Sequence, residues 1–155
     1  MKKMSIISIH GTLDMAYPPL ILASVAATLD ISTTIYFSFY GLNILRKDVD
    51  SLLKVSPLGN PAMPMPIPIP SIVQAFPGMT AMATSMMKSM IKKNGLATIS
   101  ELIAICQESG VRLIACQMAI DLFGYKKEDF INGLEYGGAA TYMEDAINSD
   151  IHLAF

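Results

Sequence analysis

Short apolar runs rich in β-branched residues alternate along the chain with longer stretches whose apolar positions recur at helical spacing. Most of the short runs end near a glycine or a polar turn, as buried strands of about four to eight residues do. The stretches between them carry the capping and stop residues that are typical of helices. The runs predicted as strands are 4–10, 32–41, 111–117 and 151–155.

The first helical stretch, 12–29, stands out because apolar residues surround most of the helix that it would form. A helix that is apolar all round is normally buried, so we predict a largely buried helix here. The other segments predicted as helical are 42–53, 79–95, 98–110, 119–124 (one turn), 126–133 and a last helix within 135–150.

The alternation of strands and helices predicts the fold class. The strands expected at 32–41 and 111–117 are nearly continuous in apolar character, which is typical of a parallel sheet covered on both faces. We therefore predict a single α/β domain over residues 1–155, with three layers and a doubly wound, mainly parallel sheet of the flavodoxin-like or Rossmann-like kind. In such folds, ligands and chemistry gather beyond the carboxyl ends of the strands.

One segment, 55–78, breaks this alternation. It holds seven of the nine prolines of the chain, including the run "PMPIPIP". Alternating prolines remove backbone donors and favour an extended path, which excludes a helix or a central strand. The methionines and isoleucines between the prolines are too apolar for a solvated linker. We predict a loop insertion that packs across the body of the protein or against a neighbouring subunit.

Charge is scarce for a chain of this size. Only 15% of the 155 residues are charged and the net charge is −2, whereas roughly 25% are charged in a typical soluble domain. Phosphate binding needs a clustered basic surface, so we expect no nucleic acid partner. The scarcity of charge predicts that other subunits cover part of the surface, and we therefore expect a homo-oligomer.

The sequence predicts neither a membrane span nor a signal peptide. The most continuous apolar stretch, 16–29, is interrupted by prolines and polar residues and is shorter than the roughly 20 residues of a spanning helix. The N-terminal "MKKMSIISIHG" offers only a brief apolar run before a polar turn. We expect a cytoplasmic protein with no transmembrane segment.

Metal and cofactor motifs are missing as well. The two cysteines, Cys106 and Cys116, make no disulfide framework and no CxxC spacing, and His10 and His152 lie at opposite ends of the sequence. No GxGxxG follows the first predicted strand, so the dinucleotide fingerprint is absent. We expect neither a metal nor a cofactor.

Cys116 is the strongest candidate for chemistry, because it falls at the carboxyl end of a predicted strand and directly before a helical turn. Backbone amides at a helix start favour negative charge and can lower the pKa of a thiol. The position is equally consistent with a small buried hydrophobic residue, which is how most free cysteines behave. Cys106 lies among apolar residues of a predicted helix, which favours a role in core packing.

Weaker candidates lie near other strand ends. His10 follows the first predicted strand and is either a donor to a sulfur anion or a simple turn residue. Tyr40 and Gly41 end the second predicted strand and are expected to line a crevice. Gly137 and Gly138 open the last predicted helix, where they either let backbone amides approach an anion or form a tight turn.

Several motifs of this chain resemble the DsrE/DsrF/DsrH-like family, in particular its DsrE-like branch. They are "GTLDMAYPPLILA", "FSFYGLNILRK", "ISELIAICQESGVRLIACQMAIDLFG" and "EYGGAATYMEDA". The resemblance covers nearly the whole chain, and its most specific part is the "ACQM-x-x-D-x-x-G" block followed by "GGAA".

This resemblance implies a three-layer α/β fold, oligomeric assembly and a part in sulfur metabolism. In sulfur relay a cysteine accepts a persulfide or thiosulfonate and passes it to another carrier, such as a TusA-like protein. The family cysteine of the "C-x-M" block maps onto Cys116, and no role carries over to Cys106. As a hypothesis, Gln117 and the amides after it stabilise the anion, while Asp121 caps or orients the following turn.

The sequence therefore predicts a sulfurtransferase-like carrier acting through Cys116, which as a stoichiometric carrier turns over only within a relay. Two other classes remain open. One is a structural or regulatory interaction module with an inert cysteine. The other is a small-molecule binding protein that uses the strand-end crevice without covalent chemistry.

Overall fold

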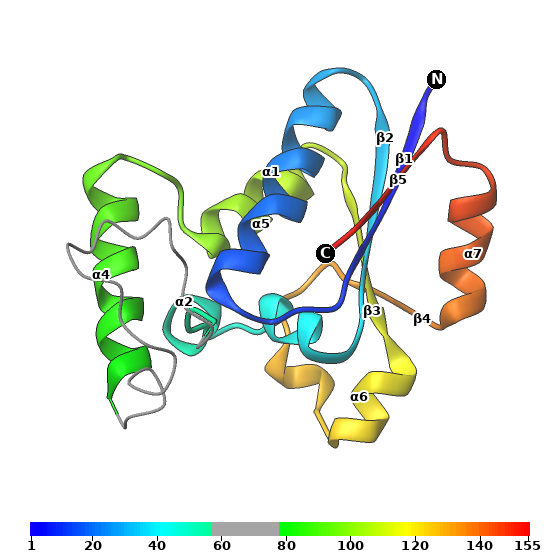
Figure 1. The fold of residues 1–155 in the computed structure, drawn as a ribbon. Helices are drawn as coiled ribbons and strands as arrows, with labels where there is room; N and C mark the ends of the chain where they lie inside the picture. The colour runs from blue at the N-terminus through cyan, green and yellow to red at the C-terminus, as the bar shows by residue number, and fades with distance from the viewer. Residues whose placement is uncertain (57–77) are drawn as a thin grey trace.

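The computed structural model describes residues 1–56 and 78–155, and its centre is a five-stranded sheet in the order β4-β3-β2-β1-β5. Every pair of neighbouring strands is parallel. The sheet runs through the middle of the molecule (Figure 1). Its strands are β1 (Lys3–Ser8), β2 (Ser32–Phe37), β3 (Arg112–Cys116), β4 (Glu135–Gly137) and β5 (Ile151–Ala154).

Helices cover both faces of this sheet, as the sequence predicted. The helices α1 (Leu13–Thr28) and α5 (Ile99–Glu108) pack together on one face, and α7 (Ala139–Ile147) lies on the other (Figure 1). Helix α7 connects β4 at one edge to β5 at the opposite edge, so the chain winds over both faces. The predicted three-layer α/β fold with a parallel sheet is confirmed.

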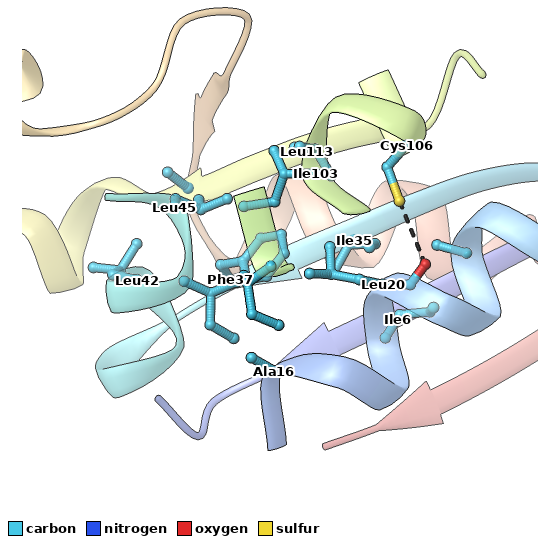
Figure 2. Packing of buried hydrophobic residues seen from close by; sticks show 14 of the residues in the cluster. Ile6, Ala16, Leu20, Ile35, Phe37, Leu42, Leu45, Ile103, Cys106 and Leu113 are labelled. Carbon is cyan, nitrogen blue, oxygen red and sulfur yellow. Dashed lines mark hydrogen bonds between the residues drawn. The ribbon is translucent and has the colours of Figure 1, made fainter. Parts of the chain in front are cut away.

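The core between the sheet and the pair α1 and α5 is built from strand residues in register. Ile6, Ile35 and Leu113 are partners on three adjacent strands, and none is more than 1% exposed. Leu20 of α1 and Ile103 of α5 pack toward them (Figure 2). Full burial of side chains of this size stabilises a fold by about 1.5–3 kcal/mol each. These contacts hold the three central strands against α1 and α5.

The predicted strand 32–41 is too long, and the helix predicted over 42–53 is wrong. Strand β2 ends at Phe37, and the 3-10 helix η1 (Phe39–Leu45) follows, with only one short helix, α2 (Val49–Leu52), beyond it. Phe39 has a positive φ of 48°, which for a bulky residue costs about 1–3 kcal/mol. This left-handed residue turns the chain out of the sheet, so neither the strand nor a regular α-helix continues.

The region after β3 also differs from the prediction. Helix α6 (Gln117–Phe123) is longer than the single turn expected at 119–124, and the short helix expected within 126–133 is the 3-10 turn η2 (Lys127–Asp129). Strand β4 stands where the last helix was expected to begin. It has only three residues and an exposed glutamate and tyrosine, so it lacks the apolar run that identifies a strand.

Helix α1 is less buried than its composition predicted. Its inner face packs into the core, but four large apolar side chains on the outer face are 41–66% exposed: Ile21, Leu22, Val25 and the following Leu29. The remaining helix, α4 (Met79–Lys93), stands beside α2 with only Thr84 buried (Figure 1).

The proline- and methionine-rich insertion predicted at 55–78 lies almost wholly outside the described residues. Among the residues that are described, no helix has the length and apolar character needed to cross a bilayer.

We predict that Gly41→Ala destabilises the protein by about 2 kcal/mol or more, because a Cβ atom there would lie 2.2 Å from the carbonyl oxygen of Ser8. Both groups belong to the backbone, so no rotamer change relieves the clash. Gly138→Ala is the matched control, since a Cβ there meets nothing within 4 Å, and it should cost less than about 1 kcal/mol. Urea unfolding followed by circular dichroism compares the two. Equal losses would contradict the close packing at Gly41.

Candidate functional site

Cys116 ends β3 and immediately precedes α6, which is where the sequence placed it. The residue is only 2% exposed. On the neighbouring strand β2, Tyr36 pairs with Ile114, two positions before the cysteine. Side chains two positions apart share a face of a sheet, so Tyr36, Ser38 and Cys116 all point toward the face that α7 covers.

The two hydroxyls next to Cys116 control its charge. Burial by itself raises the pKa of the thiol, but hydrogen bonds from Ser38 and Tyr36 and from the backbone amides of Ala119 and Met118 lower it, and the net pKa falls below the ordinary value. The pKa of Tyr36 is raised, first by burial and then by its hydrogen bond to Cys116. The two pKa shifts agree: the phenol of Tyr36 keeps its proton and donates a hydrogen bond to the Cys116 thiolate.

The opposite wall of the site comes from β4 and α7. The ring of Tyr142 on α7 lies 5.3 Å from the ring of Tyr36, with 31° between their planes. Gly137 is the register partner of Cys116, and a Cβ atom there would lie 2.6 Å from Oγ1 of Thr141. The absence of a side chain at Gly137 therefore lets Thr141 of α7 pack against the end of β4, next to the strand that carries Cys116.

Helix α7 is also tied to the sheet at its far end. Arg112, the first residue of β3, donates to Glu135 of β4 at 2.6 Å and to Asp145 of α7 at 2.8 Å. All three side chains are partly exposed, and such pairs are individually worth about 1 kcal/mol or less. Together they fix α7 over β3 and β4.

The side chains of Gln117 and Asp121 are hydrogen-bonded to each other. Nε2 of Gln117 donates to Oδ1 of Asp121 at 2.8 Å, one turn along α6. The amides that lower the pKa of the Cys116 thiol are instead those of the Met118 and Ala119 backbone. Asp121 also accepts, through its backbone carbonyl, the hydrogen bond from Gly124 that ends the helix.

The other predicted site residues lie around the same edge of the sheet at different distances along it. His10 is exposed in the loop after β1, and β2 lies between that strand and β3. Tyr40 is 64% exposed and stacks on Phe123 of α6. Gly41 is buried and donates to the carbonyl oxygens of Ile9 and Ser38. Gly138 is the N-cap residue of α7.

Tyr36 and Ser38 are the site residues that the sequence analysis missed. The strand was expected to run to residue 41, which placed Tyr40 and Gly41 at its end. The real end at Phe37 makes Tyr36 and Ser38 the side chains beside Cys116. The signal was present as alternation: hydroxyl groups stand at every second position from Thr34.

Cys106 provides a contrast within the same chain. It is fully buried on α5, and its thiol donates to the backbone oxygen of Leu20 on α1 at 3.4 Å (Figure 2). Burial raises the pKa of Cys106 to about 11. The predicted packing role of this residue agrees with its position. Within residues 1–56 and 78–155, no group of three or more His, Cys, Asp or Glu side chains is arranged to hold a metal ion.

Comparison with known proteins gives one family over nearly the full chain. The model of the DsrE/DsrF/DrsH-like family matches residues 1–154. The chain is 51% identical to the "sulfur carrier protein DsrE2" of Allochromatium vinosum, with 98% of this chain and 97% of that protein covered. It is 31% identical to the "uncharacterized protein YrkE" of Bacillus subtilis, with 98% and 96% covered.

Solved structures share the fold at much lower identity. The Methanobacterium thermoautotrophicum protein of unknown function MTH1491 has a TM-score of 0.56 and 12% identity, with 99% of each chain covered. At that identity the similarity supports the architecture and nothing beyond it.

We predict that the two thiols differ sharply in how their alkylation depends on pH. Cys116 should ionise below the pH at which a free thiol such as glutathione does, because of its hydrogen bonds, whereas Cys106 should stay unmodified in the folded protein. Iodoacetamide labelling followed by mass spectrometry measures each site, with Cys106→Ala and Cys116→Ala isolating the other thiol. The midpoint is compared rather than the rate, since low exposure slows both sites. A Cys116 midpoint at or above that of glutathione would contradict the site geometry.

Proposed function

Because the chain belongs to the DsrE/DsrF/DrsH-like family, we propose that it is a sulfur carrier, which takes up sulfane sulfur on Cys116 and passes it to the thiol of a partner protein. The observation that carries the proposal is the position of Cys116 at the carboxyl end of β3, beside Tyr36 and Ser38, whose hydroxyls lower the pKa of its thiol. The name of the Allochromatium vinosum relative supports the same activity.

Loading begins with the thiolate, which is the nucleophilic form of cysteine. Its sulfur attacks a sulfane sulfur of the donor, a new S–S bond forms, and the old bond breaks with its electron pair on the departing group. With thiosulfate as donor, the products are the Cys116 persulfide and sulfite. With tetrathionate, they are a thiosulfonate on Cys116 and thiosulfate. Each exchange balances in atoms and charge without an added oxidant or reductant.

The surroundings of Cys116 also suit a labile cargo. Its 2% exposure limits contact with bulk thiols, which would otherwise remove the outer sulfur by exchange. An inert cysteine would resemble Cys106, whose thiol donates to a backbone carbonyl and whose pKa is raised by burial. The contrast between the two thiols favours chemistry at Cys116 over a purely structural module.

We place this carrier in the cytoplasm, within a relay whose next member is a TusA-like protein or another small carrier with an acceptor thiol. Both cysteines are free, and a reducing compartment keeps free thiols reduced. Since the same thiol is consumed by loading and restored by delivery, net turnover requires both partners.

We predict that intact-mass spectrometry detects a sulfur adduct after the reduced protein is incubated with polysulfide, thiosulfate or tetrathionate. The adduct should disappear in Cys116→Ala and persist in Cys106→Ala, because only the Cys116 thiol is activated. Circular dichroism checks that both variants are folded. An adduct retained in Cys116→Ala, or no adduct with any donor, would contradict the proposed carrier.

We further predict that the protein self-associates. Its charge content is only 15%, and four large apolar side chains are exposed on or directly after α1: Ile21, Leu22, Val25 and Leu29. Sedimentation velocity over a range of concentrations should show a species larger than the 16.8 kDa monomer. Val25→Lys, which places a charge among these side chains, should shift the distribution toward the monomer. A strict monomer at every concentration would leave the exposed side chains unexplained and contradict the oligomer.

A further inference from the structure

We propose that Tyr36 and Ser38 act in the delivery of sulfur, as hydrogen-bond donors that make the Cys116 sulfur a better leaving group. This inference rests on the proposed function and assigns residues that the motif block around Cys116 does not contain. Strand register puts both residues beside Cys116 on one face of the sheet, so in the proposed reaction their hydroxyls act on the sulfur whose bond breaks.

The fold holds the two donors rigidly. Tyr36 is 4% exposed and Ser38 is 5% exposed, so water does not compete freely for the Cys116 sulfur. The Tyr36 ring is fixed between the sheet and the ring of Tyr142. Ser38 is fixed through its backbone, since its amide donates to the carbonyl oxygen of Ser8 and its carbonyl accepts from Gly41. Donors that are oriented before the reaction need no reorganisation while charge develops.

The charge moves between two sulfur atoms during the cycle. In the Cys116 persulfide, the negative charge lies on the outer sulfur, and the Sγ atom is a neutral bridge. The hydroxyls of Tyr36 and Ser38 then face a poor acceptor. When an acceptor thiolate attacks the outer sulfur, its S–S bond forms, the bond to Sγ breaks, and the electron pair goes to Sγ. The hydroxyls regain a charged partner, so they stabilise the product side more than the loaded side.

Loading should depend less on these donors than delivery does. A hydrogen bond to the thiolate increases the ionised fraction but makes the anion less nucleophilic, and the two effects partly cancel. In delivery they do not cancel, because a leaving thiolate of lower pKa departs faster. Removal of either hydroxyl should therefore slow delivery more than loading.

The test is a single-turnover measurement of sulfur release. Wild type, Tyr36→Phe and Ser38→Ala are loaded with polysulfide, freed of excess donor and mixed with cyanide, which takes the outer sulfur as thiocyanate and leaves the Cys116 thiolate. Each variant should release sulfur about tenfold more slowly than wild type, the effect of one hydrogen bond to a charged group. The alkylation midpoint of Cys116 should rise in the same variants.

The matched control is Tyr17→Phe. Tyr17 lies on α1, where its hydroxyl donates to the backbone oxygen of Ala97 at 3.1 Å, and its variant should release sulfur at the wild-type rate. Tyr36→Phe keeps the ring against Tyr142, and circular dichroism checks the fold of each variant. Loaded Tyr36→Phe and Ser38→Ala that both release at the wild-type rate would overturn this inference and leave the carrier function intact. Wild type that takes up no sulfur would overturn both.

Discussion

The loops after β1 and β2 lie so close together that neither Gly11 nor Gly41 has room for a side chain. A Cβ atom at Gly11 would lie 2.1 Å from the carbonyl oxygen of Tyr40, and one at Gly41 would lie 2.2 Å from that of Ser8. At this contact β2 ends at Phe37, and Phe39 adopts a left-handed conformation. The residue between β2 and Phe39 is Ser38, so the same backbone contact sets the position of a hydroxyl beside Cys116.

The environments of the two cysteines show which physical term controls a buried thiol. Both are at most 2% exposed, and burial disfavours the thiolate of each. At Cys106 the polar atom that the thiol contacts is a carbonyl oxygen, which accepts a hydrogen bond from the neutral thiol and does not offset this penalty. At Cys116 the neighbouring groups are all donors, two from side chains and two from the backbone, and together they outweigh burial. Whether the pKa of a buried thiol is raised or lowered thus depends on whether its neighbours accept or donate hydrogen bonds, and not on how deeply the thiol is buried.

The sequence pattern predicted the layers and the parallel sheet, because buried parallel strands are marked by apolar runs. It also predicted the position of Cys116, because the residue stands at the end of such a run. It did not predict Tyr36 and Ser38 as site residues, since the end of β2 depends on the long-range approach of Gly11 to Tyr40, which no local pattern records. Strand β4 was missed for a related reason. Its three residues are held by pairing with β3 and by the ion pair between Arg112 and Glu135, not by their own hydrophobicity.

The low exposure of the Cys116 sulfur has a kinetic consequence. Because Cys116 is only 2% exposed, a reagent reaches its sulfur when the surrounding wall opens. The observed rate of any attack on this sulfur is then the product of the fraction of open molecules and the intrinsic rate of the open form. A small competing thiol and a docked protein differ in this respect, since only the latter makes enough contacts to favour the open form. The wall therefore discriminates between acceptors by how long they stay bound, independently of their reactivity toward sulfur.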